Sequence, residues 1–233
     1  MSEPDRQHGE TALLAGQVAL VTGGESSIGR ELALGLADLG ASVAMGGGFG
    51  SRDAATAAFA TATDRHGPID VVVHVPLAAD ALVVATLADT DVEAWERRGE
   101  ALLLEALWCS QAAHRAFEGR GGHLVFVTPT VALSGAAGLV PYTTALEGIR
   151  ALAKSAARQW GGLGIRVNCV APPLELVDPA AGVAGPWIGE LALGRAPDAR
   201  TDVAPVVALL TAEAAHFVTG ATVAVDGGIL MVP

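Results

Sequence analysis

The chain has 233 residues, of which 51% are hydrophobic, and its formal net charge is -11 at pH 7. This length and composition predict a single α/β-sized domain over residues 15–233, preceded by a flexible polar tail at residues 1–14. The negative charge argues against nucleic acid as a partner. Because no apolar run approaches a membrane span of about 20 residues and no signal peptide leads the chain, we expect a cytoplasmic protein.

The first predicted unit is a strand at residues 17–22, a glycine-rich turn and a helix at residues 31–39. This order is typical of dinucleotide-binding folds, in which the turn brings its backbone close to a pyrophosphate at the helix N-terminus. The candidate contacts are Thr22, Gly23, Ser27 and Gly29. A Cβ at Ser27 would crowd an approaching phosphate. A purely structural turn is therefore an alternative to a cofactor site.

The middle of the chain carries a candidate catalytic residue. An apolar run at residues 124–127 predicts a buried parallel strand, and a loop rich in glycine and proline follows it. A helical pattern then begins near Tyr142, the only tyrosine, and extends to about Trp160.

The other expected elements are strands at 41–45, 71–75 and 164–170, helices at 54–66, 91–117 and 202–210, and a closing segment at 223–228.

Together, the Thr-Gly turn, the Tyr142 helix, the Gly-Ile-Arg-Val-Asn strand and the Val-Asp-Gly-Gly end resemble the short-chain dehydrogenase/reductase (SDR) family over about residues 15–230. The resemblance implies a Rossmann-like, doubly wound parallel sheet. It also implies a serine and a Tyr-x-x-x-Lys motif that relay a proton to or from a carbonyl or hydroxyl. Here the tyrosine position is Tyr142 and the lysine position is Leu146. The serine position is Pro129, or Thr130 if one residue is dropped.

Three further positions depart from the family pattern. The helix asparagine that holds a water near the lysine falls at Leu102, so the proton relay is expected to be missing. The strand end that reads Asn-Asn-Ala-Gly in the family begins here with His74. His74 could act as an acid or base near neutral pH, or it could simply satisfy a loop carbonyl. Glu105 is a polar residue in an apolar helical run, where it could face a subunit interface or the site, and we expect it to be exposed.

The family resemblance also predicts a deletion. The family places a helix, a third strand and a second helix between its second and fourth strands. Only residues 46–53 are left here for the first helix and that strand, which typically need roughly 11 and 5 residues. We therefore expect the third-strand region to be shortened or deleted, which would remove one wall of the adenine pocket. The loop carries no charged group before Arg52, which could serve a phosphate or be solvated.

These departures lead to three functional hypotheses. The favoured one is a non-catalytic pseudo-enzyme that has lost NAD(P)-dependent hydride transfer and acts as a subunit or scaffold. The second is a cofactor-independent dehydratase, cyclase, isomerase or lyase with Tyr142 as general acid and with Thr130 and His74 nearby. The third is an atypical NAD(P)-dependent oxidoreductase acting on a carbonyl or hydroxyl substrate. Without a neighbouring cation, the pKa of Tyr142 is expected to stay near roughly 10.

The predicted ligands and partners follow from the favoured hypothesis. No cofactor and no metal are expected, with NAD(P) as the alternative. The two cysteines, Cys109 and Cys169, are expected to be core thiols. The family's assembly surfaces predict a homo-oligomer, dimer or tetramer, or a hetero-oligomer with an active SDR subunit. A small-molecule ligand is possible at the Tyr142 pocket.

Overall fold

The structure is a computed structural model, and it describes residues 12–76, 81–177 and 190–231. The folded part begins before the predicted boundary at residue 14. Leu14 is fully buried, and its amide donates a hydrogen bond to the carbonyl of Leu39 at 2.9 Å. The remainder of the predicted tail, residues 1–11, lies outside the described residues.

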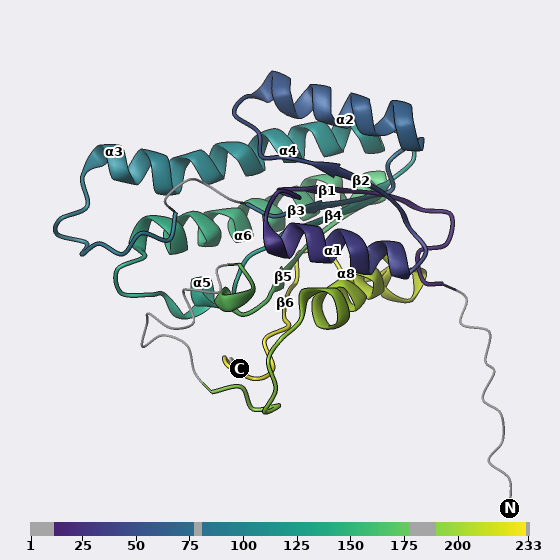
Figure 1. Cartoon of the computed structure of the whole chain (residues 1–233). Helices are drawn as coiled ribbons and strands as arrows, with labels where there is room; N and C mark the ends of the chain where they lie inside the picture. The colour runs from purple at the N-terminus through teal and green to yellow at the C-terminus, as the bar shows by residue number, and fades with distance from the viewer. Residues whose placement is uncertain (1–11, 77–80, 178–189, 232–233) are drawn as a thin grey trace, which may run out of the picture.

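A parallel sheet of six strands forms the centre of the described structure, in the order β2-β1-β3-β4-β5-β6 (Figure 1). The strands are β1 (Val18–Thr22), β2 (Ser42–Gly46), β3 (Val71–His74), β4 (Gly122–Val127), β5 (Ile165–Ala171) and β6 (Thr222–Ala224). The inner strands contain β-branched residues and are buried along most of their length, as strands covered on both faces must be. The sheet confirms the predicted Rossmann-like α/β class.

Helices cover both faces of the sheet (Figure 1). One face packs against α2 (Arg52–His66), α4 (Ala101–Phe117) and α6 (Val140–Trp160), and the other against α1 (Ser27–Asp38) and α8 (Ala204–Thr211). The remaining helices are α3 (Val92–Trp95), α5 (Val131–Ser134), π-helical turns at Glu96–Glu100 and Ala199–Val203, and 3-10 turns at Gly161–Leu163, Leu174–Leu176 and Glu213–Ala215. Two apolar cores result, one on each side of the sheet.

The expected deletion is confirmed. The strand β2 lies at the edge of the sheet, and only the short loop after Gly46 separates it from α2. Ser51 caps that helix by accepting a hydrogen bond from the amide of Ala54 at 3.1 Å. The adenine side of a nucleotide site must therefore be built from this glycine loop and not from a third strand.

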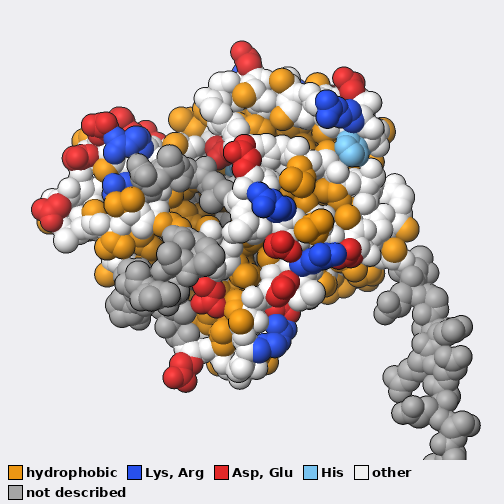
Figure 2. All heavy atoms as spheres, viewed as in Figure 1, with side chains coloured by type: hydrophobic (Ala, Val, Ile, Leu, Met, Phe, Trp, Pro, Cys, Tyr) orange, Lys and Arg blue, Asp and Glu red, His pale blue; other side chains and the backbone are white. Residues whose placement is uncertain are grey.

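The surface and the thiols agree with the composition. Acidic and basic side chains are interspersed with hydrophobic ones on the face in Figure 2, so this face does not carry a field of one sign. Cys109 and Cys169 are free and buried, as predicted. Within the described ranges, no helix combines the length and the apolar character that a membrane span needs.

Candidate active site

The glycine-rich turn between β1 and α1 is tightly built. Gly23 has φ +75°, and a Cβ there would overlap the carbonyl oxygen of Val75 and lie 3.0 Å from the Val75 Cβ. Ser26 caps α1, because its hydroxyl accepts the amide of Gly29 at 3.0 Å and donates to the carbonyl of Gly23 at 2.7 Å. The side chain of Ser27 is exposed at the start of α1. The turn therefore presents the helix N-terminus and the Ser27 hydroxyl to solvent.

Two of the predicted site residues pair with each other in the core. His74 and Thr22 are fully buried at the ends of β3 and β1, and the His74 Nδ1 lies 2.7 Å from the Thr22 Oγ1. The His74 ring stacks on Phe49 and meets Phe126 edge-on. Burial lowers the pKa of His74 from 6.5 to about 3. His74 is therefore neutral and enclosed between Thr22 and the two phenylalanine rings.

The low pKa of His74 predicts a pH-dependent stability. As the pH falls below 6.5, the histidine binds a proton in the unfolded chain but not in the folded one. The stability that His74 contributes is complete above that pH and is lost progressively toward pH 3. In urea unfolding between pH 7 and pH 5, the wild type should lose up to about 1.4 kcal/mol per pH unit more than His74→Asn.

The contribution of other histidines can be separated in this experiment. His123, whose pKa burial lowers to about 4, is present in both proteins and cancels in the comparison. If the stability of the wild type and of His74→Asn changed in parallel with pH, the conclusion that His74 stays neutral in the folded protein would be wrong.

The loop after β2 is held by a buried carboxylate. Glu105 on α4 is 4% exposed, and its Oε1 accepts the amide of Phe49 at 2.7 Å. A Cβ on Gly48 would lie 2.9 Å from the same oxygen. The expectation that Glu105 is exposed is therefore wrong, because this loop needs an acceptor for its buried amide. Phe49 is in turn carried inward, against His74 and Phe59.

Tyr142 lies in the first turn of α6, after Pro141. Its side chain is 1% exposed, and its hydroxyl has no hydrogen-bond partner among the described residues. Burial raises the pKa of the phenol above its ordinary value of 10.0, so the expectation that this pKa is unchanged is wrong. A buried hydroxyl without a partner costs about 1–3 kcal/mol, which a hydrogen-bonding ligand would recover.

The positions around the family's proton relay are apolar, as the sequence indicates. Leu146, one turn after Tyr142, and Leu102 are both fully buried in the same apolar core as Tyr142. Thr130 immediately precedes α5, and its hydroxyl donates a long hydrogen bond of 3.4 Å to the carbonyl of Pro172. Thr128 directly follows β4 and is fully buried, with the thiol of Cys169 beside it. The two threonines are the polar side chains available at this strand end.

A pocket of about 540 Å³ lies elsewhere. It is bordered by residues 224–228 after β6 and by residues 191–195, and its lining includes neither Tyr142 nor the turn at Gly23. Arg195 on its border is already paired with Asp202. We therefore do not assign the predicted chemistry to this pocket.

Comparison with known proteins identifies the family. The chain matches the model described as Enoyl-(Acyl carrier protein) reductase over residues 47–230. A cis-4-hydroxycyclohexanecarboxylate dehydrogenase of Sinomonas cyclohexanicum is 34% identical over 241 residues, which cover 92% of this chain and 96% of that protein. The chain belongs to the SDR family.

Two further proteins show how far the likeness extends. The 3-oxoacyl-[acyl-carrier-protein] reductase FabG of Pseudomonas aeruginosa is 31% identical to this SDR chain, over 94% of this chain and 99% of that protein. The crystal structure of a blue fluorescent protein from a metagenomic library, in complex with NADPH, superimposes with a TM-score of 0.75 and 25% identity. It covers 94% of this chain and 99% of that one.

These relatives correct two expectations. A pseudo-enzyme without hydride transfer was favoured from the missing serine and lysine, but the relatives are named as dehydrogenases and reductases. No cofactor was expected, but the solved neighbour holds NADPH. Both expectations are wrong, because altered side chains at a few positions do not show that a site has lost its chemistry.

The sequence analysis expected the wrong environment for Glu105 and did not find Phe49 and Thr128. Phe49 and Glu105 rebuild the loop after β2, and Thr128 adds a buried hydroxyl at the end of β4. The signal available for Glu105 was a lone carboxylate in an apolar helical run, which is costly unless it is hydrogen-bonded. No comparable local signal existed for Phe49, because its burial depends on the deletion beside it.

Proposed function

We propose that this SDR protein is an NAD(P)-dependent oxidoreductase that works best as a carbonyl reductase. The observation that carries the proposal is the Tyr142 hydroxyl, which is buried and unpartnered at the family's tyrosine position. Relatives named as dehydrogenases and as a 3-oxoacyl reductase support the reaction class. Their names suggest a secondary hydroxyl or ketone in a small carboxylate or acyl substrate.

The residues at the start of α1 fit the pyrophosphate of a dinucleotide. The first amides of a helix have no partner within the helix and favour an anion. The helix α1 has 12 residues and no acidic side chain in its first turn. The tight turn at Gly23 and the exposed Ser27 hydroxyl complete the donor set, with Gly29 allowing the helix to pack against the turn. These residues would hold the phosphates.

The direction of the reaction follows from the state of Tyr142. When bound, a reduced nicotinamide would supply the hydride. Tyr142 supplies the proton to the substrate oxygen, and burial keeps its phenol protonated at neutral pH. The reverse reaction needs a phenolate, which the apolar Leu146 does nothing to stabilise. Thr130 is the proposed second hydrogen-bond donor to the substrate oxygen.

The proposal is tested by cofactor binding followed by turnover. We expect calorimetric titration with NADH and NADPH to show micromolar binding of at least one of them. Ketone-dependent loss of the absorbance of the reduced nicotinamide should follow. Ser27→Asp should weaken binding by about tenfold or more, because it places an anion beside the pyrophosphate. The control Ser155→Asp adds the same charge at an exposed position near the C-terminal end of α6, and it should leave cofactor binding unchanged. Absence of heat at millimolar concentrations of both cofactors would refute the proposal.

We also propose that copies of the chain associate through α4 and α6. Leu104 and Leu107 on α4 are 45% and 38% exposed, which gives this helix an apolar outer side. Light scattering should show a dimer or tetramer, and Leu104→Glu combined with Leu107→Glu should dissociate it. Leu13→Glu changes another exposed leucine and should leave the mass unchanged. A monomeric wild type would contradict the proposal.

A further inference from the structure

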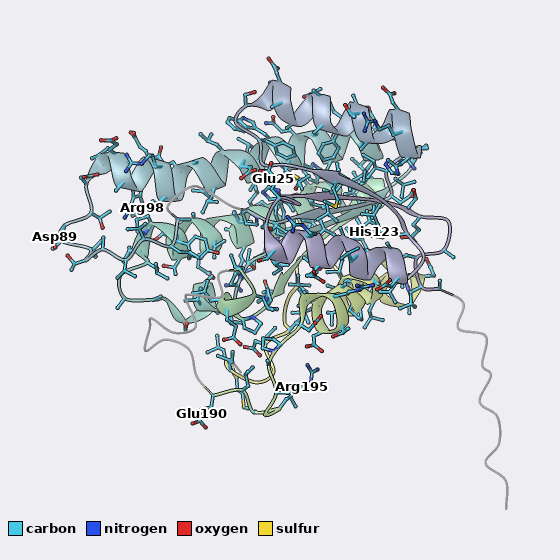
Figure 3. All side chains as sticks on the ribbon, viewed as in Figure 1. Glu25, Asp89, Arg98, His123, Glu190 and Arg195 are labelled. Carbon is cyan, nitrogen blue, oxygen red and sulfur yellow. The ribbon has the colours of Figure 1, made fainter. Side chains whose placement is uncertain are left out.

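We propose that Glu25 makes the protein select NADH over NADPH. The inference rests on the proposed function, since it concerns the adenosine end of the same cofactor site. Glu25 belongs to the turn between β1 and α1, and Figure 3 shows it near the end of the sheet where α1 begins.

Hydrogen bonds join this turn to the end of β2. The amide of Gly24 donates to the carbonyl of Gly46 at 2.9 Å, and the amide of Gly23 donates more weakly to Gly47 at 3.5 Å. The parallel register of β1 and β2 ends on the pair Thr22 and Gly46. Residues of the turn are therefore neighbours of the β2 end, which is where dinucleotide folds bind the adenosine ribose.

The Glu25 carboxylate occupies one side of this β2 end. A Cβ on Gly47 would overlap the Glu25 Oε1 and lie 3.0 Å from its carboxyl carbon. The next glycine, Gly48, meets the carboxylate of Glu105 in the same way. The two acids differ in environment, because Glu105 is buried and bonded to the Phe49 amide, whereas Glu25 is exposed. Glu25 is therefore the carboxylate that a ligand in solvent can reach.

The chemistry of the ribose then gives the selectivity. In dinucleotide folds an acidic side chain at the end of β2 accepts hydrogen bonds from the ribose hydroxyl of NAD, whereas a 2′-phosphate requires a cation. The strand itself ends in glycines here, so the turn supplies the acid in place of the strand. A 2′-phosphate beside Glu25 would bring like charges together, which costs affinity.

Arg30 is a cation close to Glu25 that could offset its negative charge. The guanidinium of Arg30 reaches the backbone carbonyl of Glu25, with its Nη2 at 3.5 Å. In the part of the chain that the structure describes, no ion pair neutralises the Glu25 carboxylate. The negative charge of Glu25 therefore faces the ribose site. If the positive charge of Arg30 dominated there instead, the protein would prefer NADPH.

Calorimetric dissociation constants for NADH and NADPH provide the test on the full chain. The wild type should bind NADH at least about tenfold more tightly than NADPH. Glu25→Gln should bring the two constants within about threefold, and Glu25→Arg should reverse the preference. The wild-type difference should also shrink in high salt, because an exposed charge is screened. Glu118→Gln removes an exposed carboxylate beyond the C-terminal end of α4 and should preserve the wild-type ratio.

The outcomes separate the two proposals. Equal binding of both cofactors, or a ratio unchanged in Glu25→Gln, would overturn the role of Glu25 and leave the oxidoreductase intact. A wild-type preference for NADPH would also overturn it, with Arg30 as the dominant charge. Binding of neither cofactor would instead refute the proposed function. Since Glu25 is exposed, thermal unfolding of its variants should match the wild type and exclude misfolding as the cause.

Discussion

Replacing Tyr142 with phenylalanine should abolish most of the reductase turnover without weakening the fold. A positioned general acid contributes roughly 10²–10⁴-fold to a rate, and no other tyrosine exists in the chain to replace it. The dissociation constant for the cofactor should change little. The free energy of unfolding should stay the same or rise slightly, because the lost hydroxyl is buried without a partner among the described residues. Single-turnover kinetics and urea unfolding measure the two effects.

The neighbouring Thr143 offers a matched control. Its hydroxyl is also buried on α6, but it donates to the carbonyl of Leu139 at 3.1 Å. Thr143→Val should therefore keep the turnover and lose about 1 kcal/mol of stability, the opposite pattern to Tyr142→Phe. If Tyr142→Phe retained turnover within a few fold of the wild type, Tyr142 would not be the proton donor.

Replacing Gly23 with alanine should destabilise the protein by about 2–5 kcal/mol. The left-handed backbone costs an L-residue roughly 1–2 kcal/mol, and forcing a methyl group into a packed site costs about 1–3 kcal/mol more. Both apply, because Gly23 has φ +75° and its Cβ would overlap the carbonyl oxygen of Val75. Urea unfolding measures the loss. Cofactor affinity should fall as well, since the turn must move away from β3.

Gly119 separates the two contributions. It has φ +73°, and a Cβ there would meet nothing within 4 Å. Gly119→Ala should therefore cost only the backbone part, roughly 1–2 kcal/mol. Equal losses in the two variants would mean that the contact with Val75 does not restrict the turn, and the close packing of turn and strand would have to be abandoned.

The family resemblance correctly predicted which side chains replace the family's lysine and asparagine, but not what this replacement means for the activity. Leu146 and Leu102 are as apolar and as buried as predicted. The step from these side chains to a protein without hydride transfer was wrong, because the relatives of this chain are named as dehydrogenases and reductases. The absence of a residue from its usual position excludes the role of that residue alone. Whether the reaction is retained depends on the other residues of the site.

The sequence by itself determined the order of strands and helices, the SDR family and the shortened region after β2. These properties depend on contiguous runs of residues, such as the buried strand at Val71–His74 and the tight turn after Thr22. The apolar surroundings of Tyr142 could be predicted for the same reason, since Leu146 lies one helical turn away.

Only the tertiary structure decided which polar groups meet. His74 pairs with Thr22 across 52 positions of sequence, and Glu105 reaches Phe49 across 56. The Glu25 carboxylate likewise lies against Gly47 because hydrogen bonds join the turn to the end of β2. The partner of a polar side chain depends on which strands are neighbours and on which one has been deleted, and neither is encoded within the few residues around it.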